Sequence, residues 1–92
     1  MTLNITDIAS LKFHFDDVLE STAEKNYRKE RIYISIIMAN TQNRKSTIIF
    51  ATSDNQVNTI SSLIKGFVND NIIIEGGCEI PLKAIFEVSL DN

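Results

Sequence analysis

The feature that most constrains this chain is a single cysteine, Cys78, in only 92 residues. One thiol can form neither an intramolecular disulfide nor a cysteine-rich metal cage. A chain of this length also has room for only one hydrophobic core. We therefore expect residues 1–92 to form one domain that is held together by packing alone.

The expected compartment follows from two absences in the sequence. No charged-then-apolar leader opens the chain, so we expect no secretory signal. Apolar runs are short, such as Ile72–Ile74, whereas a membrane-spanning helix needs about 20 apolar residues. We expect a cytoplasmic protein without a membrane partner.

Charge is distributed unevenly along the chain, whose net charge is −3. Between Lys25 and Lys45, six basic residues accompany one acidic residue, and the remainder holds three basic and eleven acidic residues. The basic residues form a candidate surface for nucleic acid or a protein partner: Lys25, Arg28, Lys29, Arg31, Arg44 and Lys45. Tyr27 and Tyr33 lie among them, a mixture typical of single-stranded nucleic-acid sites, although the overall acidity argues against that function.

A second charged group is acidic and forms a candidate partner surface: Asp16, Asp17, Glu20 and Glu24. These carboxylates lack the spacing around a glycine turn that calcium loops need. Acidic residues also stabilise the N-terminal end of a helix, which explains their position without any ligand. We predict no metal site and no cofactor.

Candidate catalytic residues are few. His14 is the only histidine and Cys78 the only thiol, and such a pair can in principle supply a nucleophile and its base. His14 alternates with phenylalanines, as a solvent-facing strand residue does, and Cys78 follows a turn as a small packing residue. We therefore predict no catalytic residues and a protein that is not an enzyme.

The N-terminal third predicts one helix, from Asp16 to about Arg28. An apolar stripe recurs there every four residues: Phe15, Leu19, Ala23 and Tyr27. The preceding residues 7–15 fit either a strand, which we prefer, or a helix capped by Asp7.

The middle of the chain predicts a β-hairpin. From Arg31 to Ala39, isoleucines and Met38 share one parity, the two-residue period of a strand. Ile37 adds apolar character to the other face, which predicts a central strand. Asn40–Asn43 is a turn cluster, and Thr47–Thr52 predicts the second strand.

A second helix is predicted over residues 55–68. Ser53 and Gln56 have the spacing of a capping box. Apolar residues then recur at helical spacing: Val57, Ile60, Ile64 and Phe67. A strand over the same residues, as part of a small barrel, is the alternative.

The C-terminal third returns to strands. Gly76 and Gly77 lie between strands at Ile72–Glu75 and Cys78–Leu82 and suit a type I′ turn. Pro81 has no backbone N–H to donate, so its strand is expected at a sheet edge. A last strand alternates at three positions: Phe86, Val88 and Leu90.

This order predicts an α+β fold in which an antiparallel β-sheet has two helices packed on one face, in a ferredoxin-like layout. Three segments carry a family resemblance: Leu63–Phe67, Ile72–Ile74 and Ile80–Val88. They resemble the C-terminal pattern of YolD-like and Sm-like small β-barrels. The resemblance implies a small Sm/SH3-like barrel, with a strand over Ser61–Phe67, as the alternative fold. The chain departs from those families at Ser62 and Val68, where they carry glycine and aspartate.

The predicted function is a small non-enzymatic protein-interaction module, such as a regulator, an inhibitor or an immunity-type protein. The layout is similar to that of small phage-encoded inhibitors of bacterial defence enzymes, which implies a bacterial or phage origin. Edge strands at Arg31–Ala39 or Phe86–Leu90 would pair with a partner or with a second copy in a homodimer. Nucleic-acid binding through residues 25–45 is the alternative.

Overall fold

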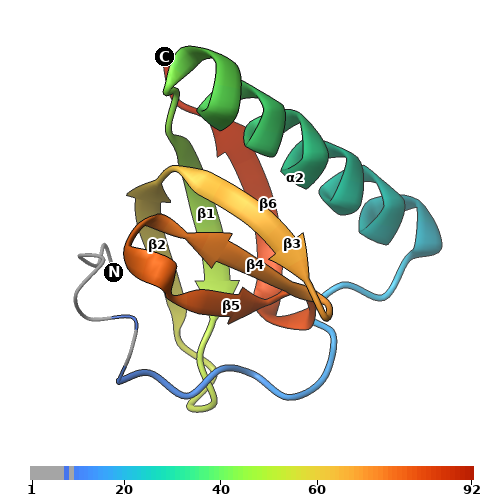
Figure 1. Ribbon diagram of the computed structural model, residues 1–92. Helices are drawn as coiled ribbons and strands as arrows, with labels where there is room; N and C mark the ends of the chain where they lie inside the picture. The colour runs from blue at the N-terminus through green and yellow to red at the C-terminus, as the bar shows by residue number, and fades with distance from the viewer. Residues whose placement is uncertain (1–7, 9) are drawn as a thin grey trace.

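The structure is a computed structural model that describes Ile8 and residues 10–92 (Figure 1). Its elements in chain order are α2 (Thr22–Gln42), β1 (Ser46–Ala51), β2 (Val57–Ser62), β3 (Ile64–Val68), β4 (Asn71–Ile74), a 3-10 turn (Glu75–Gly77), β5 (Glu79–Pro81), a second 3-10 turn (Leu82–Ala84) and β6 (Ile85–Leu90). In the described part of the chain, no helix combines the length and the apolar character needed to cross a membrane.

The strands form two antiparallel three-stranded sheets, in the orders β2-β1-β6 and β3-β4-β5. Only Leu63 separates β2 from β3, so one bent stretch of chain serves both sheets. In the first sheet β1 is central, and its Ile48 lies opposite Ile60 of β2 and Val88 of β6. Figure 1 shows the second sheet lying across the first, with α2 along one side of both.

The core lies between the sheets and the helix. Its buried members are Ile8, Ile32, Ile48, Phe50, Ile60, Ile64, Ile72, Ile74, Ile80, Ile85 and Val88. Isoleucine and valine pack well on a pleated surface, and ten of these eleven side chains are one or the other. α2 contributes Ile32 to this cluster, and Ile36 of the same helix packs against it.

The strand predicted over Arg31–Ala39 is wrong, because these residues lie inside α2. The buried residues of α2 are spaced by four, three and four positions: Arg28, Ile32, Ser35 and Ala39. Ser21 caps the helix by accepting a hydrogen bond from the Glu24 N–H at 3.2 Å, and Asn43 ends it in the left-handed region at φ 53°. Capping at both ends and helical burial outweigh the strand preference of the isoleucines. The hairpin tip predicted at Asn40–Asn43 is accordingly the end of the helix.

The helix predicted over residues 55–68 is also wrong, because this segment forms β2 and β3. The strand over Ser61–Phe67 that the barrel alternative requires is therefore present, apart from Leu63. Burial alternates with the two-residue period of a strand at Asn58, Ile60, Ser62 and Ile64. The two polar members are hydrogen-bonded: Asn58 Nδ2 donates to Thr52 Oγ1 at 3.2 Å, and Ser62 Oγ donates to the Leu63 carbonyl at 2.9 Å.

The predicted α+β class is confirmed, but the pair of helices on one face of a single sheet is not. The described residues contain one long helix and two sheets. The helix predicted from Asp16 begins only at Thr22. Residues 1–7 and 9 lie outside the described residues, and residues 11–15 are neither helix nor strand apart from an isolated bridge between Phe13 and Thr52.

The C-terminal strands are confirmed, but the connection between β4 and β5 is the three-residue 3-10 turn Glu75–Gly77 and not the predicted two-residue type I′ turn. Gly76 and Gly77 adopt φ 86° and 84° between β4 and β5, a region that glycine enters without steric cost. Pro81 lies on β5, an edge strand of its sheet. The predicted strands around Thr47–Thr52 and Phe86–Leu90 are β1 and β6.

Candidate functional site

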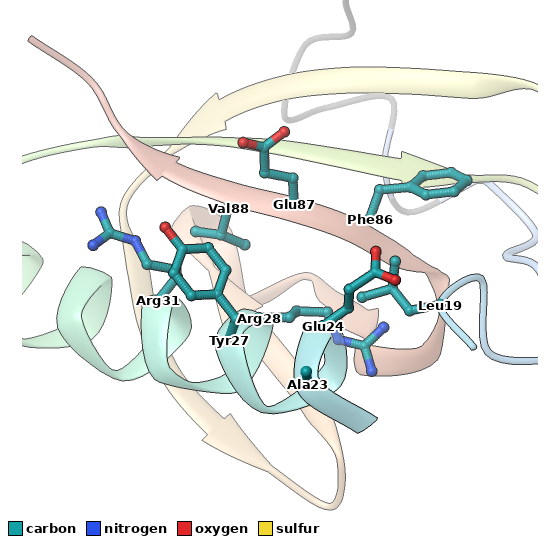
Figure 2. Close-up of a pocket in the computed structure, with 9 residues that line it drawn as sticks. All are labelled: Leu19, Ala23, Glu24, Tyr27, Arg28, Arg31, Phe86, Glu87 and Val88. Atoms are coloured by element: carbon teal, nitrogen blue, oxygen red, sulfur yellow. The ribbon is translucent and has the colours of Figure 1, made fainter. Parts of the chain in front are cut away.

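The candidate site is a groove of about 500 Å³ between the N-terminal half of α2 and the edge strand β6 (Figure 2). Ala23, Tyr27 and Arg31 line its helix side, and Phe86 and Val88 line its strand side. Most of the lining surface is apolar. We call this site the α2–β6 groove.

Two hydrogen bonds hold α2 alongside β6. Arg28 Nη1 donates to the Ile85 carbonyl at 2.9 Å at the start of β6, and Arg44 Nε donates to the Asp91 carbonyl at 2.8 Å just beyond its end. Helix and strand therefore run in the same direction. The Arg28 bond lies at the groove, and the Arg44 bond lies outside its lining.

Arg28 lies at the base of the groove and is 3% exposed. Its guanidinium donates two hydrogen bonds of 2.8 Å to the two carboxylate oxygens of Asp17. This bidentate pair compensates the buried charge. The hydrogen bond from Arg28 is the main reason that the pKa of Asp17 lies below its usual value, with a further contribution from the Leu19 N–H and an opposing one from burial. Arg28 Nε has no hydrogen-bond partner among the described residues.

The outer edge of β6 carries backbone groups that β1 does not use. The Asp91 N–H donates to the Lys45 carbonyl at 3.0 Å, which makes these opposite residues a hydrogen-bonded pair. Such pairs alternate along an antiparallel ladder, so Ser89 and Glu87 also face β1. The N–H and C=O groups of Val88 and Leu90 therefore point away from β1, along the open side of the sheet.

Successive side chains of β6 point alternately toward α2 and away from it. Figure 2 shows Val88 on the side of β6 toward α2, and Glu87 on the side away from it. Tyr27 is 60% exposed and lies over the groove from the helix. A segment that paired with β6 would thus place alternate side chains beneath α2 and in solvent.

The structure disperses the predicted basic surface. Arg28 is buried against Asp17, so it is not part of an exposed surface, and Arg44 is held by Asp91. Lys29 lies on the opposite side of α2, with its Nζ 5.7 Å from the centre of the Phe67 ring. Arg31 lines the groove and Lys25 is half-buried near the start of the helix. Lys45 follows the far end of a 21-residue helix, which spans roughly 30 Å.

The predicted acidic surface is also divided. Asp17 turns inward to Arg28, whereas Asp16, Glu20 and Glu24 are exposed. Only Glu24 belongs to α2. Within the described residues, no three His, Cys, Asp or Glu side chains come together as a metal site would require.

His14 and Cys78 both have local roles. His14 Nδ1 lies 2.8 Å from the Asp16 carbonyl oxygen, and its ring stacks on Phe15. Cys78 is a half-buried free thiol at the core margin, and its carbonyl accepts the Ile74 N–H at 2.9 Å.

Sequence reasoning found β6 as an edge strand, but it began the helix beside it at Asp16 and ended it near Arg28, whereas α2 spans Thr22–Gln42. The missed signal is Ser21-Thr22-Ala23-Glu24, a serine followed three residues later by glutamate, which is the spacing of a capping box. A helix begun there carries Tyr27 and Arg31 to one side. Comparisons with protein-family models, curated proteins and solved structures found no match to this chain.

Proposed function

We propose that this protein is a small non-enzymatic interaction module that binds an extended polypeptide segment by strand addition to β6 in the α2–β6 groove. The observation that carries the proposal is the open edge of β6 beside an apolar groove. Unpaired N–H and C=O groups on an edge strand bind another strand through main-chain hydrogen bonds, and adjacent side-chain pockets add specificity.

The lining of the groove supports an apolar side chain in the bound segment. Tyr27 and Ala23, which are exposed, and Phe86, which is half-buried, offer apolar surface to an added strand. Aromatic residues such as Tyr27 are enriched where polypeptides bind, because they supply large contact area with little conformational freedom to lose. A regulator, inhibitor or immunity-type protein would use such a groove to hold its target.

A proline substitution tests the backbone part of this proposal. Leu90→Pro removes an N–H that points outward and leaves the β1 ladder intact, whereas Leu90→Ala shortens the same side chain and keeps the N–H. Ten-residue random peptides displayed on phage are selected on the wild-type protein, and their affinities for both variants are measured by fluorescence polarisation. We expect Leu90→Ala to bind within about threefold of wild type, and Leu90→Pro to bind about tenfold more weakly, the value of one lost hydrogen bond.

Three results would overturn the proposal. One is a selection that yields no binding peptide, and another is equal binding to Leu90→Pro and Leu90→Ala. The third comes from a parallel titration with a fluorescent oligothymidylate. Oligonucleotide binding that weakens steeply with salt, in the absence of peptide binding, would move the function to nucleic acid.

A further inference from the structure

We infer that the segment which occupies the α2–β6 groove is β6 of a second copy of this chain, so that the protein forms a two-fold symmetric dimer. This inference rests on the proposed function, because it uses the same strand edge. A dimer of this kind is isologous, which means that each copy contributes the same surface. The surface must therefore be complementary to itself, and three features of the groove meet that condition.

The first feature is the direction of α2. It runs in the same direction as β6, since Arg28 is bonded at one end of the strand and Arg44 beyond the other. A two-fold axis through the β6 edge pairs the two β6 strands antiparallel and joins the sheets β2-β1-β6 into one of six strands. The same axis brings the two α2 helices side by side and antiparallel. Each helix then covers part of the other copy's strand.

The second feature is the order of charges along the exposed side of α2. Glu20 and Glu24 lie at its N-terminal end, whereas Arg31 and Lys45 lie further along or just past its C-terminal end. Antiparallel helices place the acidic end of one copy beside the basic part of the other. Within the described residues, neither Glu24 nor Arg31 forms an ion pair in its own chain. Antiparallel alignment also opposes the two helix dipoles favourably.

The third feature is apolar area at the axis. Tyr27 is 60% exposed, and Phe86 is half-buried across the groove from it. The six residues of β6 extend about 20 Å, which is the length of an ordinary strand pairing. Pairing also covers the strand edge, which otherwise invites aggregation.

Charge reversal with complementation tests the dimer. The first variant, Glu20→Lys with Glu24→Lys, reverses the charges at the N-terminal end of α2. The second, Arg31→Glu with Lys45→Glu, reverses the basic charges that would face them in the partner. Sedimentation equilibrium gives the dissociation constant for wild type, for each variant and for an equimolar mixture of the two. We expect a wild-type dimer, at least tenfold weaker association of each variant alone, and recovery of dimers in the mixture.

The mixture separates a lost interface from a lost fold, because misfolded variants would not restore each other. A strictly monomeric wild type at millimolar concentration would overturn the dimer. So would unchanged association of both variants, or a mixture that stays monomeric. The proposed function fails by a different result, the absence of peptides that distinguish Leu90→Pro from Leu90→Ala. A monomer that binds such peptides would keep the groove and remove the second copy as its occupant.

Discussion

The two sides of α2 pack against strands in different ways. On the side toward β3, Tyr33 contacts Phe67 edge to face with ring centres 6.0 Å apart, and Lys29 lies over the same ring. On the side toward β6, Tyr27 extends over a groove. Phe67 of β3 packs directly against the helix, whereas Phe86 of β6 and Tyr27 of the helix line a groove between them.

The open side is nevertheless anchored. Arg28 bonds the base of the groove to Asp17 and to the start of β6, and Arg44 bonds the chain just past α2 to Asp91. The proposed binding surface is therefore formed without a partner, which lowers the ordering cost of binding.

The largest expected effect is the loss of the anchor beneath the groove. Arg28→Met removes the ion pair of the partly buried Asp17 carboxylate, which keeps only the Leu19 N–H as a donor, and removes the side-chain donor to the Ile85 carbonyl. We expect the free energy of unfolding to fall by about 3 kcal/mol. Arg31→Met, in the wall of the same groove, should change it by less than about 0.5 kcal/mol. Urea denaturation followed by circular dichroism measures both. Equal losses of unfolding free energy in the two variants would mean that Arg28 contributes no more to stability than Arg31.

The next largest effect compares the two sides of the helix directly. Phe67→Ala removes a ring packed against the core and should destabilise the protein by about 2 kcal/mol. Tyr27→Ala should leave stability within about 0.5 kcal/mol and weaken binding in the groove instead. Thermal unfolding together with peptide titration tests both. A Tyr27→Ala loss as large as that of Phe67→Ala would show that the β6 side is also structural.

Acid should lower the free energy of unfolding by protonating Asp17, which pairs with Arg28 at the base of the groove. Its pKa is lowered in the folded protein, chiefly by hydrogen bonding to Arg28. Because this pKa is lower in the folded than in the unfolded protein, the ionised carboxylate stabilises the fold. This stabilisation is fully present above the unfolded-state pKa, near 4. It is lost as the pH falls through the folded-state pKa. We expect Asp17→Asn to lose this part of the pH dependence below about pH 4. Asp91, whose pKa is lowered by hydrogen bonds from Ser61 and Thr47, retains its own part.

The smallest effect concerns the buried face of α2, which lies between the side toward β3 and the side toward β6. Ser35 is fully buried, and its hydroxyl has no hydrogen-bond partner in the part of the chain that the structure describes. Ser35→Ala should therefore raise the free energy of unfolding by about 1 kcal/mol, because it removes an unpaired buried group and favours the helix. Chemical denaturation checks this gain. A loss above about 1 kcal/mol would imply a buried partner such as an ordered water.

Local chemistry made the C-terminal part of the fold predictable from the sequence. Gly76 and Gly77 mark the turn and Pro81 marks an edge, because each acts through its own backbone. The later part of α2 was predicted as a strand because its isoleucines also alternate with a two-residue period. β2 was hidden because its buried face includes Asn58 and Ser62, whose hydrogen-bond partners are supplied by other loops and turns.

The candidate site was predictable only in part. The edge strand near Phe86–Leu90 follows from alternation, and it is the strand wall of the groove. The ion pair at the base of the groove could not be predicted from the sequence. Arg28 and Asp17 are eleven residues apart, and each fits a solvent-facing position by sequence alone. Their pairing depends on how the fold brings the chain before α2 beside the helix.

The most direct test of the central claim, an open β6 edge beside α2, is residue-resolved amide hydrogen exchange by NMR on dilute monomeric protein. We predict fast exchange at Val88 and Leu90, whose N–H groups point outward, and slow exchange at Glu87 and Ser89, which face β1. A bound peptide or a second copy should then slow Val88 and Leu90 selectively. Equal protection of all four amides in the dilute, unbound protein would show that the edge is already paired and would contradict the account.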